Sequence, residues 1–351
     1  MSMQRFLINL QYAVNFRKPQ LMMRLASNML QVVLLRKDLL RHIDINVGPA
    51  CNLKCQHCFA SNFKKDEPLL TNAEWTKVAD ECNELGSVVF QLTGGEPLAY
   101  KSLDGIIKSL RPQKNLITIA TNGTLVTEKR LKELKKIGVD VMVFSLDSGN
   151  PEEHDEFRNA KGTYDRVMKS IEMCQKLKMK VSITTTLTHK NIRSKDMFKL
   201  FDYAIKRRLM VSIALLVPAG RALEHDEFAI TEEDSEYLDK VLVPKYPNLR
   251  RDWETNYWKT GCGAATEKLY IAPYGDVMTC PYIHLSFGNA KKDSIKTIQK
   301  RMMKVPEFRK YPKICLAAED KGFQEKYMYP TFDSPTTPIM FSEVDNAKKK
   351  R

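Results

Sequence analysis

The sequence predicts an α/β protein: a partial (β/α)6 barrel of the TIM type, with N-terminal helices and a small C-terminal α+β module. Two observations support this prediction. Strand-like and helical segments alternate six times between residues 42 and 246, which is typical of parallel strands joined by right-handed crossovers. Each strand-like segment also runs into a polar motif, and the carboxyl ends of the strands are where such barrels place their chemistry.

The six strand segments are short and rich in β-branched and aromatic residues. They cover residues 43–47, 88–92, 116–120, 141–144, 181–186 and 211–216. Helical periodicity fills the gaps between them, for example over residues 71–85, 129–137 and 164–177. The barrel is therefore expected over residues 42–246.

The segment before the barrel, residues 1–41, is expected to form basic amphipathic helices. Residues 1–37 carry six Lys and Arg side chains and no acidic one. Two interpretations remain open for residues 1–37. The helices could pack on the barrel, or a basic helix could lie on an anionic membrane as a peripheral contact.

A different region follows the barrel, and we expect a module over residues 247–329. Two strands are predicted over residues 268–272 and 276–279, around the turn at 273–275, and helices over 295–304 and 317–328. Residues 330–351 are rich in Pro, Ser and Thr and end in lysines, so we expect a basic mobile tail.

Composition limits the class of protein. With 351 residues, 43% of them hydrophobic, the chain can bury a large core. The net charge of +14 raises the question of nucleic acid, but the sequence contains no aromatic-rich basic motif, so nucleic acid is not favoured as a partner. Three of the eight cysteines fall within eight residues, which indicates metal ligands rather than disulfides and predicts a reducing cytoplasm.

Those three cysteines, Cys51, Cys55 and Cys58, have the spacing C-x3-C-x2-C on a loop after the first strand. Three thiolates can hold three irons of a [4Fe–4S] cluster and leave the fourth iron open to a small molecule. The alternative is a zinc site, although structural zinc sites usually have four ligands in closed pairs.

The cysteine loop is followed in order by three further motifs: Gly94-Gly95-Glu96-Pro97, Thr121-Asn122-Gly123 and Ser145-Leu146-Asp147. Together they resemble the radical S-adenosylmethionine (radical SAM) superfamily over residues 42–225. The resemblance implies a cluster that reductively cleaves S-adenosylmethionine to a 5′-deoxyadenosyl radical, which abstracts hydrogen from a small-molecule or peptide substrate. It also implies a reductant such as a flavodoxin or ferredoxin.

The resemblance implies roles for residues around the cofactor. His57 matches the position that lies by the adenine, and Gly94 and Gly95 would let the backbone approach the ligand's charged end. Glu96 would accept from the amino group, and Asn122 and Ser145 would bond the ribose or carboxylate. Arg158 would pair with the carboxylate, and Arg221 matches a similar basic position. For both arginines an ordinary surface ion pair is the alternative. No catalytic residue is assigned.

A second cysteine set has the spacing Cys262-x12-Gly275-x4-Cys280, followed by Cys315. It resembles the SPASM extension or its shorter form, called twitch, although the dense cysteine run of the full pattern is missing. Three thiolates allow one auxiliary [4Fe–4S] cluster, with its fourth iron open to substrate or bound by a residue such as His284. The alternative is a module that has lost its metal. Cys82 and Cys174 are expected in the barrel core.

Two other functions stay open from the sequence. The basic N-terminal segment allows a lipid-linked substrate at the membrane surface. The chain could also be a non-enzymatic zinc-binding or interaction protein on a decayed barrel.

Overall fold

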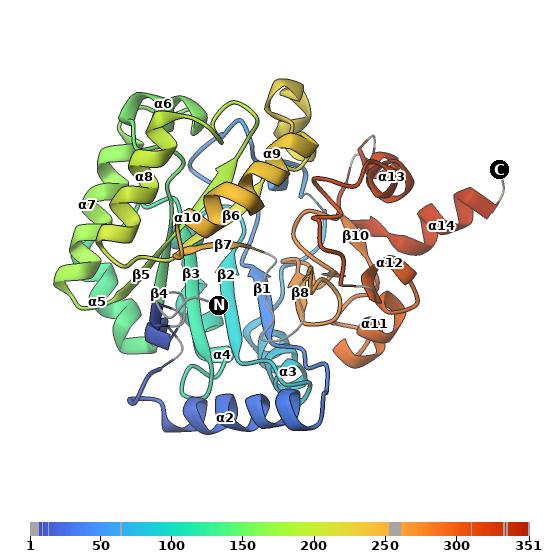
Figure 1. Ribbon diagram of the computed structural model, residues 1–351. Coiled ribbons are helices and arrows are strands. Elements are labelled where there is room, and N and C mark those ends of the chain that lie inside the picture. Colours follow the sequence, from blue (N-terminus) through green and yellow to red (C-terminus); the bar gives the residue numbers. More distant parts are fainter. Residues whose placement is uncertain are drawn as a thin grey trace.

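The computed structural model describes residues 7–349 apart from residues 9, 13, 64, 253–260, 310, 333 and 335 (Figure 1). One curled sheet forms its centre, in the strand order β7-β6-β5-β4-β3-β2-β1-β8-β9. All neighbouring strands are parallel except β8 and β9. The strands are β1 His42–Asn46, β2 Val89–Thr93, β3 Leu116–Thr121, β4 Val141–Ser145, β5 Lys180–Leu187, β6 Val211–Leu215, β7 Leu249–Arg251, β8 Lys268–Ile271 and β9 Val277–Met278. The predicted partial barrel is confirmed.

The register of the sheet separates an apolar outer face from a polar inner face. Ile43 and Ile45 of β1 are fully buried, and they pair with the equally buried Phe90 and Leu92 of β2. The residue between them, Asp44, pairs with Gln91 of β2. Because successive side chains of a strand point to opposite faces, the polar residues line the lumen of the curled sheet and the apolar ones meet the helices.

Helices cover the outer face of the sheet. Helix α3 shows how the sequence builds them: Thr71 and Glu74 form a capping box at its start, and Trp75, Val78 and Cys82 bury one side of it. The outer helices are α3 Asn72–Glu84, α4 Leu103–Ser109, α5 Glu128–Ile137, α6 Pro151–Phe157, α7 Thr163–Lys176 and α8 Lys195–Lys206, with the short elements η1 Phe59–Asn62, η2 Pro97–Ala99, η3 Gly220–Glu224 and η4 Asp226–Phe228. Between β6 and β7 lie α9 Glu232–Tyr237, the π-helix η5 Leu238–Leu242 and α10 Val243–Lys245.

The predicted hairpin of the C-terminal module extends the barrel sheet. Strand β8 lies parallel to β1, and β9 returns antiparallel to β8. A further pair of strands, β10 Leu285–Ser286 and β11 Ile339–Met340, forms a small separate sheet. Beside the strands lie α11 Ile295–Met302, α12 Pro306–Arg309, α13 Lys321–Phe323, the π-helix η6 Gln324–Met328 and η7 Tyr329–Thr331.

Residues 336–349, within the segment 330–351 that is predicted to be a basic mobile tail, contain secondary structure, and the mobility of the tail stays a prediction. Strand β11 pairs with β10, and helix α14 Phe341–Lys349 follows it. The ring of Phe341 stacks on Phe287 with centroids 4.7 Å apart, and Val344 is buried. Apolar side chains near the end of the chain therefore anchor a segment that its Pro, Ser and Thr content made look unstructured.

Helix α2 Pro19–Leu34 lies across the amino-terminal ends of the strands, at the bottom of Figure 1. Before it, Ile8 and Tyr12 pack against Val141 and Val143 of β4. This end of the barrel, which we call the base, is opposite to the strand ends that carry the polar motifs. None of the described helices is both long and apolar enough to cross a membrane.

Candidate active site

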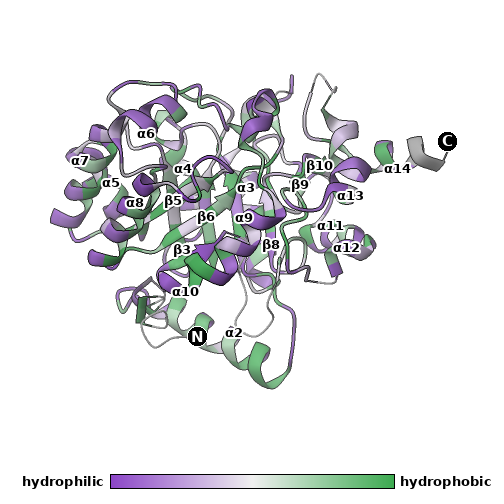
Figure 2. Cartoon of the chain, turned by 45° about the horizontal axis from the view of Figure 1, so that its top comes forward, coloured by the Kyte–Doolittle hydropathy of each residue, from purple (hydrophilic) through white to green (hydrophobic). Residues whose placement is uncertain are grey.

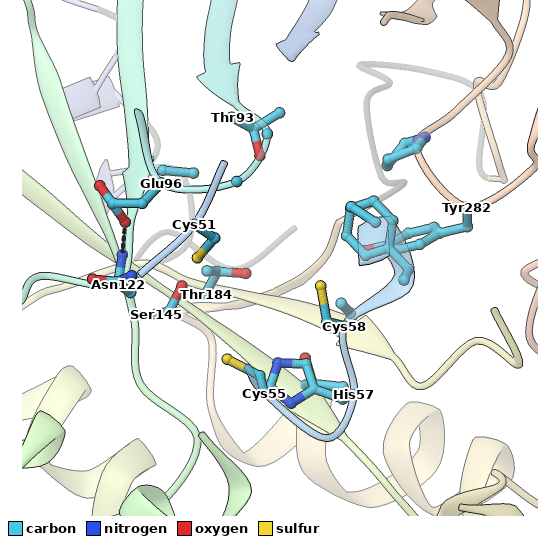
Figure 3. Close-up of a pocket in the computed structure, with 18 of the residues that line it drawn as sticks. Cys51, Cys55, His57, Cys58, Thr93, Glu96, Asn122, Ser145, Thr184 and Tyr282 are labelled. Carbon is cyan, nitrogen blue, oxygen red and sulfur yellow. Dashed lines mark hydrogen bonds between the residues drawn. The ribbon is translucent and has the colours of Figure 1, made fainter. Parts of the chain in front are cut away.

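The three cysteines of the first motif lie on the loop after β1, around a shared space at the carboxyl end of the sheet (Figure 3). All three are free thiols, with Cys55 buried and Cys51 exposed. Partial loss of solvation by the surrounding loop raises the pKa of Cys51 and of Cys58, and the charges of neighbouring thiols also raise it. Three thiolates at these positions therefore need a strong positive charge between them, as an iron–sulfur cluster provides.

The glycines of the second motif pack against the cysteine loop. A Cβ atom on Gly95 would lie 2.0 Å from the carbonyl oxygen of Ala50, and one on Gly94 would lie 2.3 Å from Oδ1 of Asn46. Both distances are far below any contact that real Cβ atoms make. These glycines therefore let the turn after β2 approach the chain that leads to Cys51. Both glycines also line the cavity. That their backbone approaches the charged end of a bound ligand stays a prediction.

Glu96 connects the turns after β2 and β3. Its buried carboxylate accepts hydrogen bonds from the Thr121 hydroxyl at 2.7 Å, the Asn122 N–H at 2.8 Å and the Leu98 N–H at 3.1 Å. Burial raises the pKa of Glu96, although these donors oppose the rise. A carboxylate offers about four acceptor positions, so Glu96 retains room for one donor from a ligand in the cavity.

Asn122 and Ser145 both line the cavity (Figure 3). The Asn122 side chain donates to Oδ1 of Asn52 at 3.0 Å and accepts from the Thr124 hydroxyl at 2.7 Å. Since Asn52 follows Cys51 directly, this bond ties the turn after β3 to the cysteine loop. Ser145 ends β4 on the luminal side, beside Thr184 of β5 in the sheet register.

His57 presents an unsatisfied nitrogen at the cavity. Its ring stacks on Phe157 with centroids 4.1 Å apart, and its buried Nδ1 has no hydrogen-bond partner among the described residues. Burial, helped by the charge of Arg158, lowers the pKa of His57 to about 3, so the ring is neutral. A buried polar atom without a partner is unusual in a native protein, and a bound ligand would satisfy it.

Both predicted arginines lie beside Cys55, and neither forms a surface ion pair with any residue that the structure describes. The Nε and Nη2 atoms of Arg158 are each 2.6 Å from Oδ2 of Asp147, and its Nη1 is 3.8 Å from the Cys55 sulfur. Arg221 donates from Nε to the Cys55 carbonyl oxygen at 2.8 Å. Burial lowers the pKa of Arg158, but the charge of Asp147 raises it by more, so the pKa is raised on balance. The ion pair therefore fixes the Arg158 guanidinium next to the Cys55 thiol.

The cavity has a volume of about 640 Å³ and extends from the cysteine loop into the lumen. Its lining includes polar residues that the sequence motifs did not indicate, among them Asp44, Gln91, Asp252, Lys268 and Tyr282. The Lys268 ammonium lies 3.1 Å from Oδ2 of Asp44, and Gln91 donates to Oδ1 of Asp44 at 3.1 Å. A polar residue between two isoleucines in a strand was the one sequence signal for Asp44.

Asp252 and Tyr282 form the other polar pair of the lumen. The Tyr282 hydroxyl donates to Oδ2 of Asp252 at 2.9 Å. Burial raises the pKa of Asp252, while Lys268 and the Tyr282 hydroxyl lower it. Neither residue belongs to a sequence motif: Asp252 lies ten positions before Cys262, and Tyr282 follows Cys280 by two positions.

The structure brings Cys262, Cys280 and Cys315 within electrostatic range of one another. Burial, together with the charge of Cys280, raises the pKa of Cys262 to about 12. Burial also raises the pKa of Cys315, and so do both other thiols. The Cys262 N–H donates to the carbonyl oxygen of Pro312 at 2.7 Å, which holds the first cysteine against the segment that carries the third.

Asp252 affects the pKa values of all three auxiliary cysteines, whereas His284 packs against an aromatic ring. The negative charge of Asp252 raises the pKa of Cys262, Cys280 and Cys315 alike. His284 is buried against the Phe63 ring, with centroids 4.7 Å apart, and its Nε2 has no partner in the described part of the chain. Burial lowers the pKa of His284 to about 4.

The remaining cysteines, Cys82 in α3 and Cys174 in α7, are fully buried in the hydrophobic core, as expected. Among the described residues, no three His, Cys, Asp or Glu side chains are grouped around the position of a single metal ion. In Figure 3 the three sulfur atoms of the first motif lie apart, around the shared space. The geometry therefore adds no support for a zinc site.

Two family models match this sequence. Residues 45–203 match the radical SAM superfamily, and residues 262–318 match the iron–sulfur cluster-binding domain called SPASM. The two matched segments together cover more than half of the chain. They contain both cysteine sets, one in each segment.

Characterised relatives extend the similarity along the chain. An AdoMet-dependent heme synthase of Methanosarcina barkeri is 26% identical over 313 residues, which are 78% of this chain and 89% of that protein. The Bacillus subtilis protein AlbA, named for biosynthesis of the antilisterial bacteriocin subtilosin, is 27% identical over 274 residues, covering 73% of this chain and 59% of AlbA.

Solved structures share the fold. Streptococcus suis SuiB bound to the precursor peptide SuiA matches with a TM-score of 0.58 and 17% identity, over 82% of this chain and 70% of SuiB. The protein anSMEcpe with bound AdoMet and the Kp18Cys peptide matches with a TM-score of 0.61 and 17% identity, over 89% of this chain and 99% of that protein.

Proposed function

Because this chain belongs to the radical SAM superfamily and carries a SPASM iron–sulfur domain, we propose that it abstracts hydrogen from a peptide or small molecule held in the barrel lumen. The observation that carries the proposal is the convergence of three free thiols and the polar motifs on one cavity of about 640 Å³. Cys51, Cys55 and Cys58 would hold the catalytic [4Fe–4S] cluster. When bound and reduced, this cluster would supply one electron to the sulfonium of S-adenosylmethionine, whose S–C5′ bond would break to give methionine and a 5′-deoxyadenosyl radical.

The chain's own residues would position S-adenosylmethionine. The unpaired Nδ1 of the neutral His57 ring suits the adenine, because a neutral heterocycle and a neutral ring can hydrogen-bond and stack without a charge penalty. Glu96 would accept from the amino group with its remaining lone pair. Asn122 and Ser145 would contact the ribose or the carboxylate.

We infer that Arg158 does more than bind the carboxylate of S-adenosylmethionine. Its Nε and Nη2 are used by Asp147, so only Nη1 faces the cavity side, next to the Cys55 sulfur. We expect this guanidinium to hold a positive charge beside the Cys55 sulfur, 3.8 Å away, where the negatively charged cluster would bind. Arg221 would hold the backbone of the same cysteine through its carbonyl oxygen.

Cys262, Cys280 and Cys315 would hold one auxiliary [4Fe–4S] cluster. A substrate that loses a hydrogen atom becomes a radical, and completing a two-electron oxidation requires it to lose one further electron and one proton. The auxiliary cluster would accept that electron, and a reductant such as a flavodoxin or ferredoxin would supply the electron for the first cluster. Tyr282 and Asp252 lie between the lumen and the auxiliary cysteines, where a substrate must bind for this transfer.

The substrate would meet donors and acceptors from two buried pairs, Lys268 with Asp44 and Tyr282 with Asp252. Peptide backbones and polar small molecules both suit such a lining. The solved structures with bound peptides support a peptide, and the heme synthase relatives support a small molecule. A lipid-linked substrate is less suited, because helix α2, with exposed basic residues beyond its two ends, lies at the opposite end of the barrel from the polar motifs (Figure 1).

The proposal is tested by anaerobic reconstitution with iron and sulfide, followed by reductant and S-adenosylmethionine. We expect about eight irons per chain for two clusters, and formation of 5′-deoxyadenosine. Cys55→Ala should abolish 5′-deoxyadenosine, whereas Cys174→Ala, a core cysteine outside both sets, should leave it unchanged. Cys262→Ala should halve the iron content and spare cleavage. Unchanged cleavage by Cys55→Ala would contradict the assignment of the catalytic cluster.

A further inference from the structure

Helix α2 attaches to the base of the barrel through polar bonds. The Arg24 guanidinium donates to Oδ1 of Asn83 at 2.7 Å and to the carbonyl oxygen of Ser87 at 2.7 Å. Asn28 donates to the carbonyl oxygen of Gly86 at 2.6 Å. These partners all lie at the end of α3 or in the turn that leads into β2. The side of α2 that faces the protein therefore combines these polar bonds with apolar packing, since Leu21 is fully buried.

The residue before α2 continues this attachment. Lys18 is buried, and its ammonium donates to the carbonyl oxygens of Asn115 at 3.0 Å and Gly138 at 2.8 Å. It also pairs with the carboxylate of Asp140. Asn115 and Asp140 precede β3 and β4, so the attachment reaches across three strand entrances.

The opposite side of α2 is apolar and faces outward. Figure 2 shows the helix as a hydrophobic segment at the outer edge of the molecule. Five large apolar side chains on it and just after it are more than half exposed: Met23 at 64%, Met29 at 54%, Leu30 at 58%, Leu34 at 67% and Leu35 at 60%. Helix α2 buries Leu21 against the base and in addition leaves these side chains exposed, which forms an apolar surface beyond what attachment to the barrel requires.

Positive charge surrounds this apolar face. Arg17, Arg36 and Lys37 are exposed at the two ends of α2. The turns that enter the strands on the same base add the exposed residues Lys178, Arg207 and Arg208. Acidic residues offset this charge only in part: Asp140 is buried against Lys18, Asp80 pairs with Arg111 and Lys114, and Asp38 and Glu84 are exposed.

We propose that α2 docks this protein on an anionic lipid bilayer, with the exposed Met and Leu side chains in the interfacial region and the basic residues against the headgroups. An apolar helical face rimmed with Lys and Arg is the combination that binds such interfaces. A second copy of the chain fits less well, because a symmetric contact through α2 would bring two basic surfaces together. The catalytic cavity at the other end of the barrel would then face away from the bilayer.

The test is co-sedimentation of the full-length protein with vesicles of phosphatidylcholine mixed with phosphatidylglycerol, compared with phosphatidylcholine alone. We expect binding to the anionic vesicles, weakened by salt. Leu30→Gln with Leu34→Gln should weaken it at least tenfold, because two exposed apolar side chains leave the interface. Arg36→Gln with Lys37→Gln should weaken it by about fivefold for each charge removed.

The matched control replaces two exposed apolar residues elsewhere, Leu69→Gln with Val241→Gln, and should bind like the unaltered protein. All variants should form 5′-deoxyadenosine at the same rate, so a failure of this proposal is separate from a failure of the proposed function. Equal sedimentation of the Leu30/Leu34 variant and the control would overturn the proposal. A dimer in size-exclusion chromatography that this variant disrupts, without binding to vesicles, would overturn it in favour of an interface between copies.

Discussion

Arg158→Met removes one partner of the buried ion pair beside Cys55 and tests how that pair supports the site. The side chains of Arg158 and Asp147 are 10% and 1% exposed, and both bonds between them measure 2.6 Å. Burial alone would raise the pKa of Asp147, but Arg158 lowers it on balance. Without Arg158 the carboxylate would stay buried and unpaired, which costs about 3–5 kcal/mol of unfolding free energy.

The assay is urea unfolding of the cluster-free protein in a double-mutant cycle. Asp147→Asn with Arg158→Met removes both charges and keeps an acceptor for the Thr186 N–H, which bonds Oδ1 of Asp147 at 2.9 Å. We expect this double variant to recover about 2 kcal/mol relative to Arg158→Met. Both variants should still lose 5′-deoxyadenosine formation, because the charge beside Cys55 is gone. Strictly additive unfolding costs would refute a coupled buried pair.

Three further predictions follow from single contacts. Gly95→Ala should lower iron incorporation at least tenfold, because its Cβ would lie 2.0 Å from the Ala50 oxygen, whereas Gly322→Ala, with its nearest neighbour at 3.5 Å, should incorporate iron normally. Tyr282→Phe should lower product formation at least tenfold while 5′-deoxyadenosine still forms, as chromatography of both compounds would show; parallel loss of both would contradict a role in substrate binding. Asp44 has its pKa lowered to about 2, because Lys268 and His42 outweigh the effect of burial. Above pH 4 the depressed pKa contributes about 2–3 kcal/mol to the free energy of unfolding, and this contribution is lost as the pH falls towards 2. The unaltered protein should therefore lose its stability advantage over Asp44→Asn in that pH range, which acid unfolding of both proteins would measure.

The sequence by itself determined the barrel and the edge at which its chemistry lies. Period-two apolar segments and the motifs after Asn46, Thr93 and Thr121 depend on local chain geometry, and parallel strands must bring their carboxyl ends to one edge. The spacing of Cys51, Cys55 and Cys58 needed nothing else to indicate a shared metal group.

Only the tertiary structure decided which side chains share the lumen and what covers each surface. Asp252 and Tyr282 are far apart in sequence and meet because β8 adds to the edge of the barrel sheet. Arg158 binds Asp147 with two of its nitrogen atoms, because the turn after β4 places the Asp147 carboxylate next to the guanidinium. The spacing of apolar residues does not show which apolar side chains of α2 face outward. Their direction depends on the bonds of Arg24 to turns that are distant in the chain.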